Sequence, residues 1–517
     1  QEYERNRRII FVLSVTTTTL SVCPINISTP SKCVVIIGAG PAGIAAARTL
    51  IKAGITPVIL EGRERVGGRV CKQVLTQNLI SSSDDEISVY SDDEYSQAPS
   101  EVVIQLGANW VHGLDSTVNP LYSVAKELKL DLHPTSPDEF PGSDVCLFDS
   151  TDSVSFAEIT VDDYKSMLRR YKWVTEHIDM DLPDEVDIPL SEAFRLATIA
   201  SEDITLPFGP CTERERRCLN WCYDRISIDS GISIEKISMR YYGSTPSDGD
   251  YGEALVEGGF HQIISHLATE YALDVRLGHT VTSVLKTSHN IFSVKCTNGA
   301  IFEAEHVIST IPIGVLQSNA VEFSPRPPQL DRLCQLQFGV MNLVWIWFPY
   351  QFWPSGYNFF GLSRYDHSPT EFSTFLVPPM KDQYGNSQAI LMCQIFDEFA
   401  ISIEKMSNTE ISEKVVQSLR RVFVTVPDAI GCMHSSWKSD KFSQGSYSCA
   451  PPANSSSIFT KDWSTESGVR GLYFAGEACH LDHMGTAHGA YISGVREASK
   501  ILNTIGLSDA VSDSVFQ

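Results

Sequence analysis

The sequence lacks an uninterrupted run of 18 apolar residues, which is about the length that a helix needs to span a membrane. We therefore expect no ordinary membrane span. Basic residues are also scarce, because 40 Lys and Arg stand against 63 Asp and Glu and the formal net charge is −23. General nucleic-acid binding requires a basic face that neutralises phosphates. The composition thus argues against a nucleic-acid partner and is compatible with a cationic ligand.

The thirteen cysteines lack a Cys-x-x-Cys pair, and Cys218 and Cys222, the nearest to a cluster, have no His or Cys at ligand spacing. This pattern predicts reduced core thiols, no disulfide framework and no metal site, and it favours the cytoplasm. Secretion remains the alternative, because three arginines precede the apolar stretch Ile9–Val15 in the order of a signal peptide.

Basic residues are absent altogether from residues 73–125, which contain eight acids: Asp84, Asp85, Glu86, Asp92, Asp93, Glu94, Glu101 and Asp115. Without these eight acids the net charge would be −15. Low hydrophobicity combined with charge of one sign leaves little surface to bury. We predict that residues 76–100 form an exposed or disordered acidic insert of unknown role.

A strand–helix–strand pattern opens the ordered part of the sequence. The apolar run Cys33–Ile37 leads into Gly38-Ala39-Gly40-Pro41-Ala42-Gly43, and a helix-like stretch follows at Ile44–Ala53. A second apolar run, Pro57–Leu60, ends at Glu61. Continuous apolar runs of this length are typical of buried parallel strands.

The glycines and the acid of this unit predict a dinucleotide site. Gly38 suits the tight turn, Gly40 lets the backbone approach a pyrophosphate, and Gly43 allows the helix to pack closely on the strand. The helix N-terminus faces the phosphates, and Glu61 can accept a hydrogen bond from a ribose hydroxyl.

The stretch Glu61–Arg69, EGRERVGGR, resembles the E-x-R-x-R-x-G-G-R motif of the flavin-containing amine oxidases, and the chain is most similar to polyamine oxidases. The resemblance covers roughly residues 33–505. Its other matching stretches, in family order, are Gly107–Gly113, Val256–Phe260, Ser309–Leu316, Gln444–Ser448, Tyr473–Ala478, Gly485–Tyr491 and Gly494–Ala498.

The resemblance implies a site for FAD. In the related monoamine oxidases a cysteine within Gly-Cys-Tyr binds FAD covalently, whereas this chain has Gly445-Ser446-Tyr447. We therefore expect non-covalent FAD. The residues that the resemblance places at FAD are Gly38, Gly40, Gly43, Glu61, Arg63, Gly68, Arg69, Ala108, Asn109, Trp110, Val281, Glu477, Thr486 and Ala487.

The same resemblance implies catalytic and substrate-binding residues. His112 would lie at the mouth of the substrate tunnel and exchange hydrogen bonds or a proton with an amine. Tyr447 is either an aromatic wall of the site or a core residue. Thr486 is either a helix cap or the start of a helix that faces the flavin, and both roles are compatible. Asp224 and Asp229 lie where relatives carry a carboxylate for a distal ammonium.

One position departs from the family. Leu343 occupies the place of a lysine that, in relatives, reaches flavin N5 through a water. A leucine side chain has no donor and no charge.

The fold expected from these features is α/β. An FAD-binding Rossmann-like, doubly wound domain is built from discontinuous segments and carries an inserted α+β substrate-binding domain. We assign residues 32–119, 250–320 and 441–506 to the FAD-binding domain and residues 120–249 and 321–440 to the substrate domain. Residues 1–31 and 507–517 are tails.

The predicted function is an FAD-dependent polyamine oxidase. It would oxidise a secondary amine of spermine, spermidine or their acetyl derivatives to an imine, which hydrolyses to an aldehyde and an amine, and it would reduce O₂ to H₂O₂. The alternatives are a polyamine sensor or scaffold with weakened catalysis, which Leu343 favours, a histone demethylase of the same superfamily, and an amino-acid oxidase. The last requires an arginine that faces the substrate. The polyamine, the oxidised carbon and the oligomeric state stay open.

Overall fold

The computed structural model describes residues 34–76, 101–135, 145–150, 157–178, 186–244, 252–363, 371–381, 387–451 and 467–507. These residues all belong to the unit Cys33–Gln517. The predicted acidic insert lies outside the described residues, except for Thr76 at its start.

A five-stranded parallel sheet of order β10-β2-β1-β14-β23 has β1 at its centre. The two apolar runs expected to be buried parallel strands form β1 and β2. All residues of β1 and β14 are buried, because both faces of the sheet are covered. The strands are β1 (Val34–Ile37), β2 (Val58–Leu60), β10 (Asp274–Arg276), β14 (His306–Ser309) and β23 (Leu472–Phe474). Three distant chain segments thus build one sheet, as the discontinuous α/β domain requires, although the domain bounds themselves stay a prediction.

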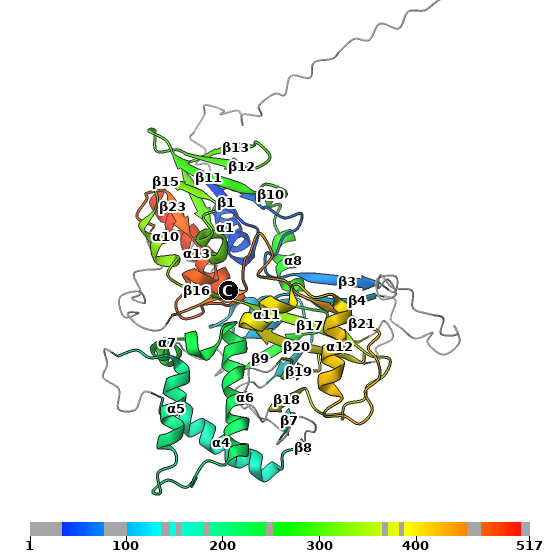
Figure 1. Cartoon of the computed structure of the whole chain (residues 1–517). Coiled ribbons are helices and arrows are strands. Elements are labelled where there is room, and N and C mark those ends of the chain that lie inside the picture. Colours follow the sequence, from blue (N-terminus) through cyan, green and yellow to red (C-terminus); the bar gives the residue numbers. More distant parts are fainter. Residues whose placement is uncertain are drawn as a thin grey trace, which may run out of the picture. The chain divides into compact units, whose positions relative to one another are not determined.

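Two different layers cover this sheet. Val34 and Ile36 of β1 pack against α1 (Pro41–Lys52) and α13 (Ala487–Thr504), which lie side by side in Figure 1. A Cβ at Gly494 of α13 would lie only 2.1 Å from the Ala42 carbonyl oxygen, so a glycine permits this close approach. Val35 and Ile37 face a four-stranded sheet of order β13-β12-β11-β15, whose strands are Ile301–Ala304, Phe292–Cys296, Val281–Lys286 and Glu322–Ser324.

A seven-stranded sheet, of order β21-β17-β20-β19-β18-β7-β8, forms the second large layer. One of its faces packs on α4 (Val161–Glu176), α5 (Leu190–Ala200) and α6 (Glu213–Ser230). The other face packs on α11 (Asp397–Ile403) and α12 (Asn408–Leu419). Its strands are Gly431–His434, Met341–Trp347, Ile390–Phe396, Thr374–Leu376, Phe359–Ser363, Val145–Asp149 and Ala157–Glu158. Strand β7 lies within residues 120–249, the first segment assigned to the substrate domain. Because β7 pairs with β18, more than 200 residues away, local patterning does not reveal it.

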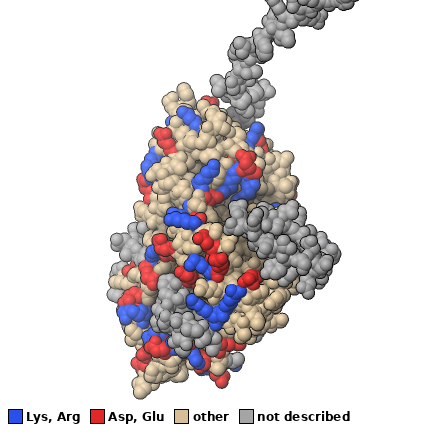
Figure 2. Space-filling view, turned by 45° about the vertical axis from the view of Figure 1, so that its right-hand side comes forward, with Lys and Arg blue, Asp and Glu red and all other residues tan. Residues whose placement is uncertain are grey.

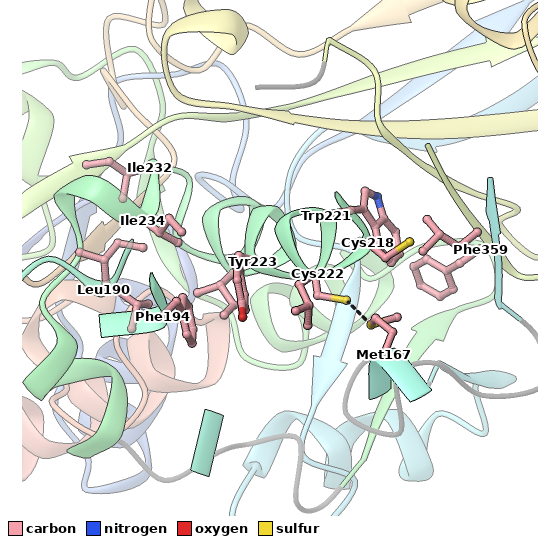
Figure 3. Close-up of a cluster of buried hydrophobic side chains, with 14 of the residues drawn as sticks. Met167, Leu190, Phe194, Cys218, Trp221, Cys222, Tyr223, Ile232, Ile234 and Phe359 are labelled. Carbon is pink, nitrogen blue, oxygen red and sulfur yellow. Dashed lines mark hydrogen bonds between the residues drawn. The ribbon is translucent and has the colours of Figure 1, made fainter. Parts of the chain in front are cut away.

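Helix α6 (Glu213–Ser230) is the best-anchored element of this part. Thr212 and Glu215 form a capping box at its start, and Gly231 with φ of 64° ends it. Figure 3 shows Trp221, Cys222 and Tyr223 of α6 within a cluster of buried side chains, where the Cys222 thiol contacts the Met167 sulfur at 3.6 Å. This packing fixes the helix whose last turns reach the cavity described below.

The remaining elements complete the described part of the chain. The helices are α3 (Pro120–Glu127), α4 (Val161–Glu176), α5 (Leu190–Ala200), α7 (Met239–Ser244), α8 (His261–Thr269), α9 (Ile313–Gln317), α10 (Pro328–Leu333), α11 (Asp397–Ile403), α12 (Asn408–Leu419), η1 (Ile234–Lys236) and η4 (Glu477–Cys479). The small sheets are β3 (Lys72–Thr76) with β4 (Glu101–Gln105), β16 (Gln337–Gly339) with β22 (Tyr447–Cys449), and β5 (Trp110–His112), β9 (Glu253–Val256) and β6 (Leu132–Thr135).

A buried ion pair joins α6 to β7. Arg217 donates to both oxygens of Asp149 at 2.8 and 2.7 Å, and Ser363 donates to the same carboxylate at 2.7 Å. Burial raises the pKa of the Asp149 carboxyl, but the hydrogen bonds from Arg217 and Ser363 outweigh it and hold the pKa below its ordinary value. Arg214 approaches the same carboxylate at 3.4 Å from the solvent side.

We predict that Arg217→Met lowers the free energy of unfolding by about 3–5 kcal/mol, because it leaves a buried carboxylate without its partner. Arg214→Met is the matched control and should cost less than about 1 kcal/mol, because the Arg214 side chain is 47% exposed. The pKa of Asp149 is lower in the folded protein than in the unfolded chain. The difference in unfolding free energy between the two variants should therefore be present above pH ~4 and shrink as the pH falls toward the folded-state pKa. Urea denaturation at several pH values measures the free energy of unfolding of each variant. Equal losses for the two variants would contradict the stabilising role of the Arg217–Asp149 pair.

Candidate active site

A cavity of about 1140 Å³ opens at the carboxyl ends of the parallel strands. Gly38 after β1, Glu61 after β2 and Thr310 after β14 line one end of it. The lining continues to the last turns of α6 and to residues of α4 and α7. A crevice beyond the carboxyl ends of parallel strands is the place where such sheets bind ligands. One end of the cavity therefore lies where such sheets bind nucleotides, and residues of α4, α6 and α7 line the other end.

The glycines of the first turn form a cradle that the protein itself does not fill. Gly38 adopts φ of 101°, and a Cβ at Gly43 would lie 1.9 Å from the Gly38 carbonyl oxygen, so both are required by the fold. Gly40 is different, because its φ is −80° and the nearest atom to an added Cβ is 4.0 Å away. Gly476, opposite in the lining, has no atom within 4 Å of such a Cβ. This open space at a helix start fits the pyrophosphate of FAD.

The Glu61 carboxylate is fixed at the end of β2. One oxygen accepts from the Ala39 amide and the other from the Arg63 amide, both at 2.8 Å, and the residue is 6% exposed. Each carboxylate oxygen can accept a second hydrogen bond. The acceptor capacity that remains at Glu61 therefore fits the ribose hydroxyls of the adenosine half of FAD.

Arg63 is held by a partner that the sequence did not reveal. It donates to both oxygens of Asp440 at 2.6 and 2.7 Å and lies over the Phe442 ring. Burial raises the pKa of the Asp440 carboxyl, but the hydrogen bonds and charge of Arg63 leave that pKa below its ordinary value. The pair thus places a fixed guanidinium beside the cradle.

Glu477 connects several segments at the same end of the cavity. Its carboxylate accepts from Arg69 at 3.0 Å, from the amide and hydroxyl of Ser448 at 3.2 and 3.1 Å, and from the Gly485 amide at 3.1 Å. Arg69 also donates to the Ser446 carbonyl at 2.6 Å. This network brings the region before β22 and the loop before α13 against the first segment of the chain.

Thr486 caps α13, as one of its two expected roles requires. Its hydroxyl accepts from the Gly489 amide at 2.9 Å and donates to the His483 carbonyl at 2.8 Å. Thr486 and Ala487 line the cavity, as do Gly40 and Pro41 at the start of α1. Two helix N-termini therefore face the cavity, and each favours negative charge there.

His112 pairs with a carboxylate from the neighbouring strand. Its Nδ1 lies 2.5 Å from Glu253 Oε1, since His112 and Glu253 are direct partners in the β5–β9 register. Both side chains line the cavity. The sequence did not reveal Glu253, because 141 residues separate it from His112 in the sequence and it belongs to no recognised motif. A carboxylate at this distance orients the imidazole ring.

The two candidate acids of α6 are placed differently. Asp229 lines the cavity, whereas Asp224, in the described part of the chain, is outside the lining. The Asp229 side chain is 64% exposed and lines the cavity. Burial raises its pKa, and Glu253 adds to this, while Arg225 and His112 act in the opposite direction. Arg225, one helical turn before Asp229, also lines the cavity and approaches it at 3.6 Å.

Leu343 and Tyr447 add apolar surface to the lining. Leu343 of β17 is 1% exposed and lines the cavity beside its cross-strand partner Gln394. Tyr447 also lines it, and its hydroxyl donates to the Ile228 carbonyl at 2.5 Å. Burial raises the pKa of the Tyr447 phenol well above its ordinary value. Tyr447 is thus a fixed neutral ring of the wall.

The structure gathers most of the residues singled out from the sequence around this single cavity. Gly43 and Asp224 do not line it. Those that do are Gly38, Gly40, Glu61, Arg63, Gly68, Arg69, Ala108, Asn109, Trp110, His112, Asp229, Val281, Leu343, Tyr447, Glu477, Thr486 and Ala487. Lining residues that the sequence did not reveal include Arg225, Glu253, Gln394, Tyr171 and Tyr242.

Other features of the described residues concern partners. The described cysteines are free thiols, and no group of three His, Cys, Asp or Glu in the described ranges is placed to hold a metal ion. Within the same ranges, no helix is both long and apolar enough to cross a membrane. On the face shown in Figure 2, acidic and basic side chains are interspersed.

Comparison with known proteins agrees with this geometry. The profile of the family described as flavin containing amine oxidoreductase matches residues 41–502. Polyamine oxidase 5 of Oryza sativa subsp. japonica is 28% identical over 501 residues, which cover 95% of this chain and 91% of that protein. Polyamine oxidase 4 of the same plant is 29% identical over 496 residues, which cover 93% and 91%.

Two further similarities define the range of relatives. Lysine-specific histone demethylase 1 homolog 1 of Arabidopsis thaliana is 29% identical over 485 residues, which cover 91% of this chain and 52% of that protein. The chain therefore spans about half the length of this demethylase. The solved structure of wild-type putrescine oxidase bound to putrescine has a TM-score of 0.66 at 20% identity and covers 91% of this chain and 99% of its own. This last likeness shows a shared fold.

We predict that Gly40→Val weakens FAD binding at least about tenfold, or ~1.4 kcal/mol, because the new side chain fills the cradle. The φ of Gly40 accepts any residue, and the space around it is open, so the apoprotein should keep its melting temperature. Titration of apoprotein with FAD, followed by flavin fluorescence, measures the affinity. Unchanged affinity, or a large loss of apoprotein stability, would contradict a cradle that is shaped for the cofactor.

Proposed function

The chain belongs to the family of flavin-containing amine oxidoreductases, and we propose that it is a polyamine oxidase. Its cofactor is FAD, as the family match establishes. When bound, FAD supplies the acceptor for two electrons from the C–H bond next to an amine nitrogen. O₂ would then be the final electron acceptor, with H₂O₂ as its product. The polyamine oxidases among the relatives support this reaction.

The residues of this chain would hold FAD at the strand end of the cavity. Gly40 and the start of α1 would receive the pyrophosphate, Glu61 the adenosine ribose, and the start of α13 at Thr486 the electron-rich edge of the flavin. Val281 would act through its backbone. Ser446 stands where covalent relatives have a cysteine, so the attachment would be non-covalent.

The observation that carries the proposal is the open carboxylate of Asp229 inside the cavity. A carboxylate that lines a cavity with 64% of its side-chain surface exposed can bind a cation. Glu253 and His112 lie beside it, and the Tyr447 ring and Leu343 give apolar surface for an alkyl chain. Such a cavity fits a chain that alternates methylenes with amines. In this arrangement His112 would exchange a proton with the substrate, and Asp229 would hold a distal ammonium.

A methylated lysine side chain is the second candidate substrate. The demethylase relative of similar identity favours it. An amino-acid substrate would need an arginine that faces its carboxylate, and Arg225, the lining arginine nearest to Asp229 in the sequence, is already engaged with Asp229 and Gln394. A sensor or scaffold without turnover stays open because Leu343 carries no charge. We keep the cytoplasm as the proposed location, on the cysteine pattern of the sequence.

Anaerobic mixing with spermidine tests the proposal. We predict that the FAD-loaded protein loses its oxidised flavin absorbance with spermidine and not with a dimethyl-lysine histone peptide. Asp229→Asn should raise the spermidine concentration for half-maximal reduction about tenfold, since a charged hydrogen bond of ~1.5 kcal/mol is lost. Asp224→Asn, on the same helix but outside the cavity lining, should leave it unchanged.

Three results would contradict parts of this account. No bleaching by any amine would leave the sensor alternative. Bleaching by the histone peptide alone would favour the demethylase alternative. An equal effect of the two asparagine variants would remove the role of Asp229.

Leu343 offers a separate prediction. Leu343→Lys restores a charged donor at a lining position next to Gln394 and should accelerate flavin reduction about tenfold. Leu343→Met keeps the length and apolar character of the wall and serves as the control. Stopped-flow absorbance under anaerobic conditions measures both variants. An unchanged rate for the lysine variant would show that this position does not limit the reaction.

A further inference from the structure

A short chain of polar groups crosses the cavity between its acidic side and its apolar wall. Arg225 Nη1 donates to Gln394 Oε1 at 2.6 Å, and Arg225 Nη2 lies 3.6 Å from Asp229 Oδ1. The guanidinium also lies over the Phe359 ring, 5.9 Å from its centre. All four residues line the cavity. The order across the site is therefore carboxylate, guanidinium, amide and then Leu343.

The hydrogen bond from Arg225 orients the Gln394 amide. An arginine only donates, so the amide atom that it contacts is the oxygen, and the amide nitrogen is directed elsewhere. Within the described part of the chain, this nitrogen donates to no other protein group. Gln394 is 4% exposed and lies in an apolar stretch of wall beside Leu343. An amide donor that lines the cavity and has no protein acceptor is available to a ligand that accepts a hydrogen bond.

The groups on the two sides of the Arg225 guanidinium, Asp229 and Gln394, favour different protonation states of a bound amine. An ammonium is a donor only, and the open Asp229 carboxylate is its natural partner. A neutral amine has a lone pair, and the Gln394 amide nitrogen can donate to it. An ammonium at Gln394 would face an N–H donor, an apolar wall and the charge of Arg225, all of which disfavour the cation.

We propose that Gln394, oriented by Arg225, binds the reacting nitrogen of a di- or polyamine in its neutral form while Asp229 binds another nitrogen as an ammonium. The inference rests on the proposed function and deepens it, because oxidation needs the lone pair of the nitrogen next to the C–H bond. Gln394 is then a substrate-contacting residue and Arg225 a positioning residue. The proton that the reacting nitrogen gives up leaves to solvent on binding.

Other ionisable groups surround this arrangement and set its balance. Asp229 and Cys222 on α6 and Tyr447 on β22 are the titratable groups that interact with Arg225. Glu253 and His112 interact with Asp229 from β9 and β5. Among these groups, the two carboxylates, Asp229 and Glu253, interact with each other.

Calorimetric titration of spermidine into the FAD-loaded protein tests the proposal. The flavin is first reduced with dithionite without oxygen, so that no turnover occurs, and the titration is run at pH ~7.5 in two buffers of different ionisation enthalpy. Free aliphatic amines have pKa values of about 10 and are protonated at this pH. We expect the wild-type protein to release close to one proton per spermidine bound, because one nitrogen is bound neutral.

Variants separate the roles of the two side chains. Gln394→Leu and Arg225→Gln should at least halve the proton release and weaken binding about tenfold, since the donor or its orientation is lost. Gln394→Glu should abolish the release while it retains binding, because a carboxylate there accepts an ammonium. Arg195→Gln removes an exposed arginine that pairs with Glu192 on α5 and should match the wild type. Flavin content confirms that each variant is folded.

Each outcome decides the proposal. Proton release by the wild type that falls in the three cavity variants supports it. No release by the wild type, release by the variants equal to the wild type, or no spermidine binding would overturn it. Proton release without flavin bleaching in the oxidised protein would contradict the oxidase function and leave the binding inference standing. Flavin bleaching without proton release would support the oxidase function and contradict the binding inference.

Discussion

The Glu477 carboxylate is the interaction on which the cavity depends. It is 5% exposed and accepts hydrogen bonds from Arg69, Ser448 and Gly485, which come from three distant parts of the chain. A buried carboxylate is tolerated only with such partners. These hydrogen bonds join the loop before α13 and the strand β22 to Arg69, in the segment that follows β2. The ligand end of the parallel sheet is therefore assembled around this one acid.

The opposite end of the cavity depends on a different kind of constraint. Helix α6 is fixed by its capping box, by its buried face and by the pair of Arg217 with Asp149. Its last turns then place Arg225 and Asp229 in the cavity with little freedom. The acid lies across the guanidinium from the Gln394 amide, so the site offers a different environment to each end of a diamine. The two ends together account for an FAD-dependent reaction on an amine.

The local part of this site was predictable from the sequence, and the part made by packing was not. Gly38, Gly40, Gly43 and Glu61 act within about thirty residues of one strand–helix–strand unit, so spacing alone revealed them. Asp440, which holds the lining residue Arg63, and Gln394, which itself lines the cavity, come from segments more than 150 residues from their partners Arg63 and Arg225. No local pattern marks such contacts.

One signal in the sequence distinguishes the two candidate acids of α6. Arg225 and Asp229 are four residues apart on a helix and so share a face, whereas Asp224 lies on another side. Helical spacing alone therefore favours Asp229 as the partner of Arg225. The strand β7 had no comparable signal, because its pairing with β18 depends on a distant partner.

A crystal structure of the FAD-loaded protein, reduced and soaked with spermidine without oxygen, tests the central claim most directly. The account predicts the flavin along the cavity that Gly40, Glu61 and Glu477 line, with one spermidine nitrogen at the Asp229 carboxylate and another at the Gln394 amide. Spermidine bound outside this cavity, or the nitrogens placed with no contact to either residue, would contradict it.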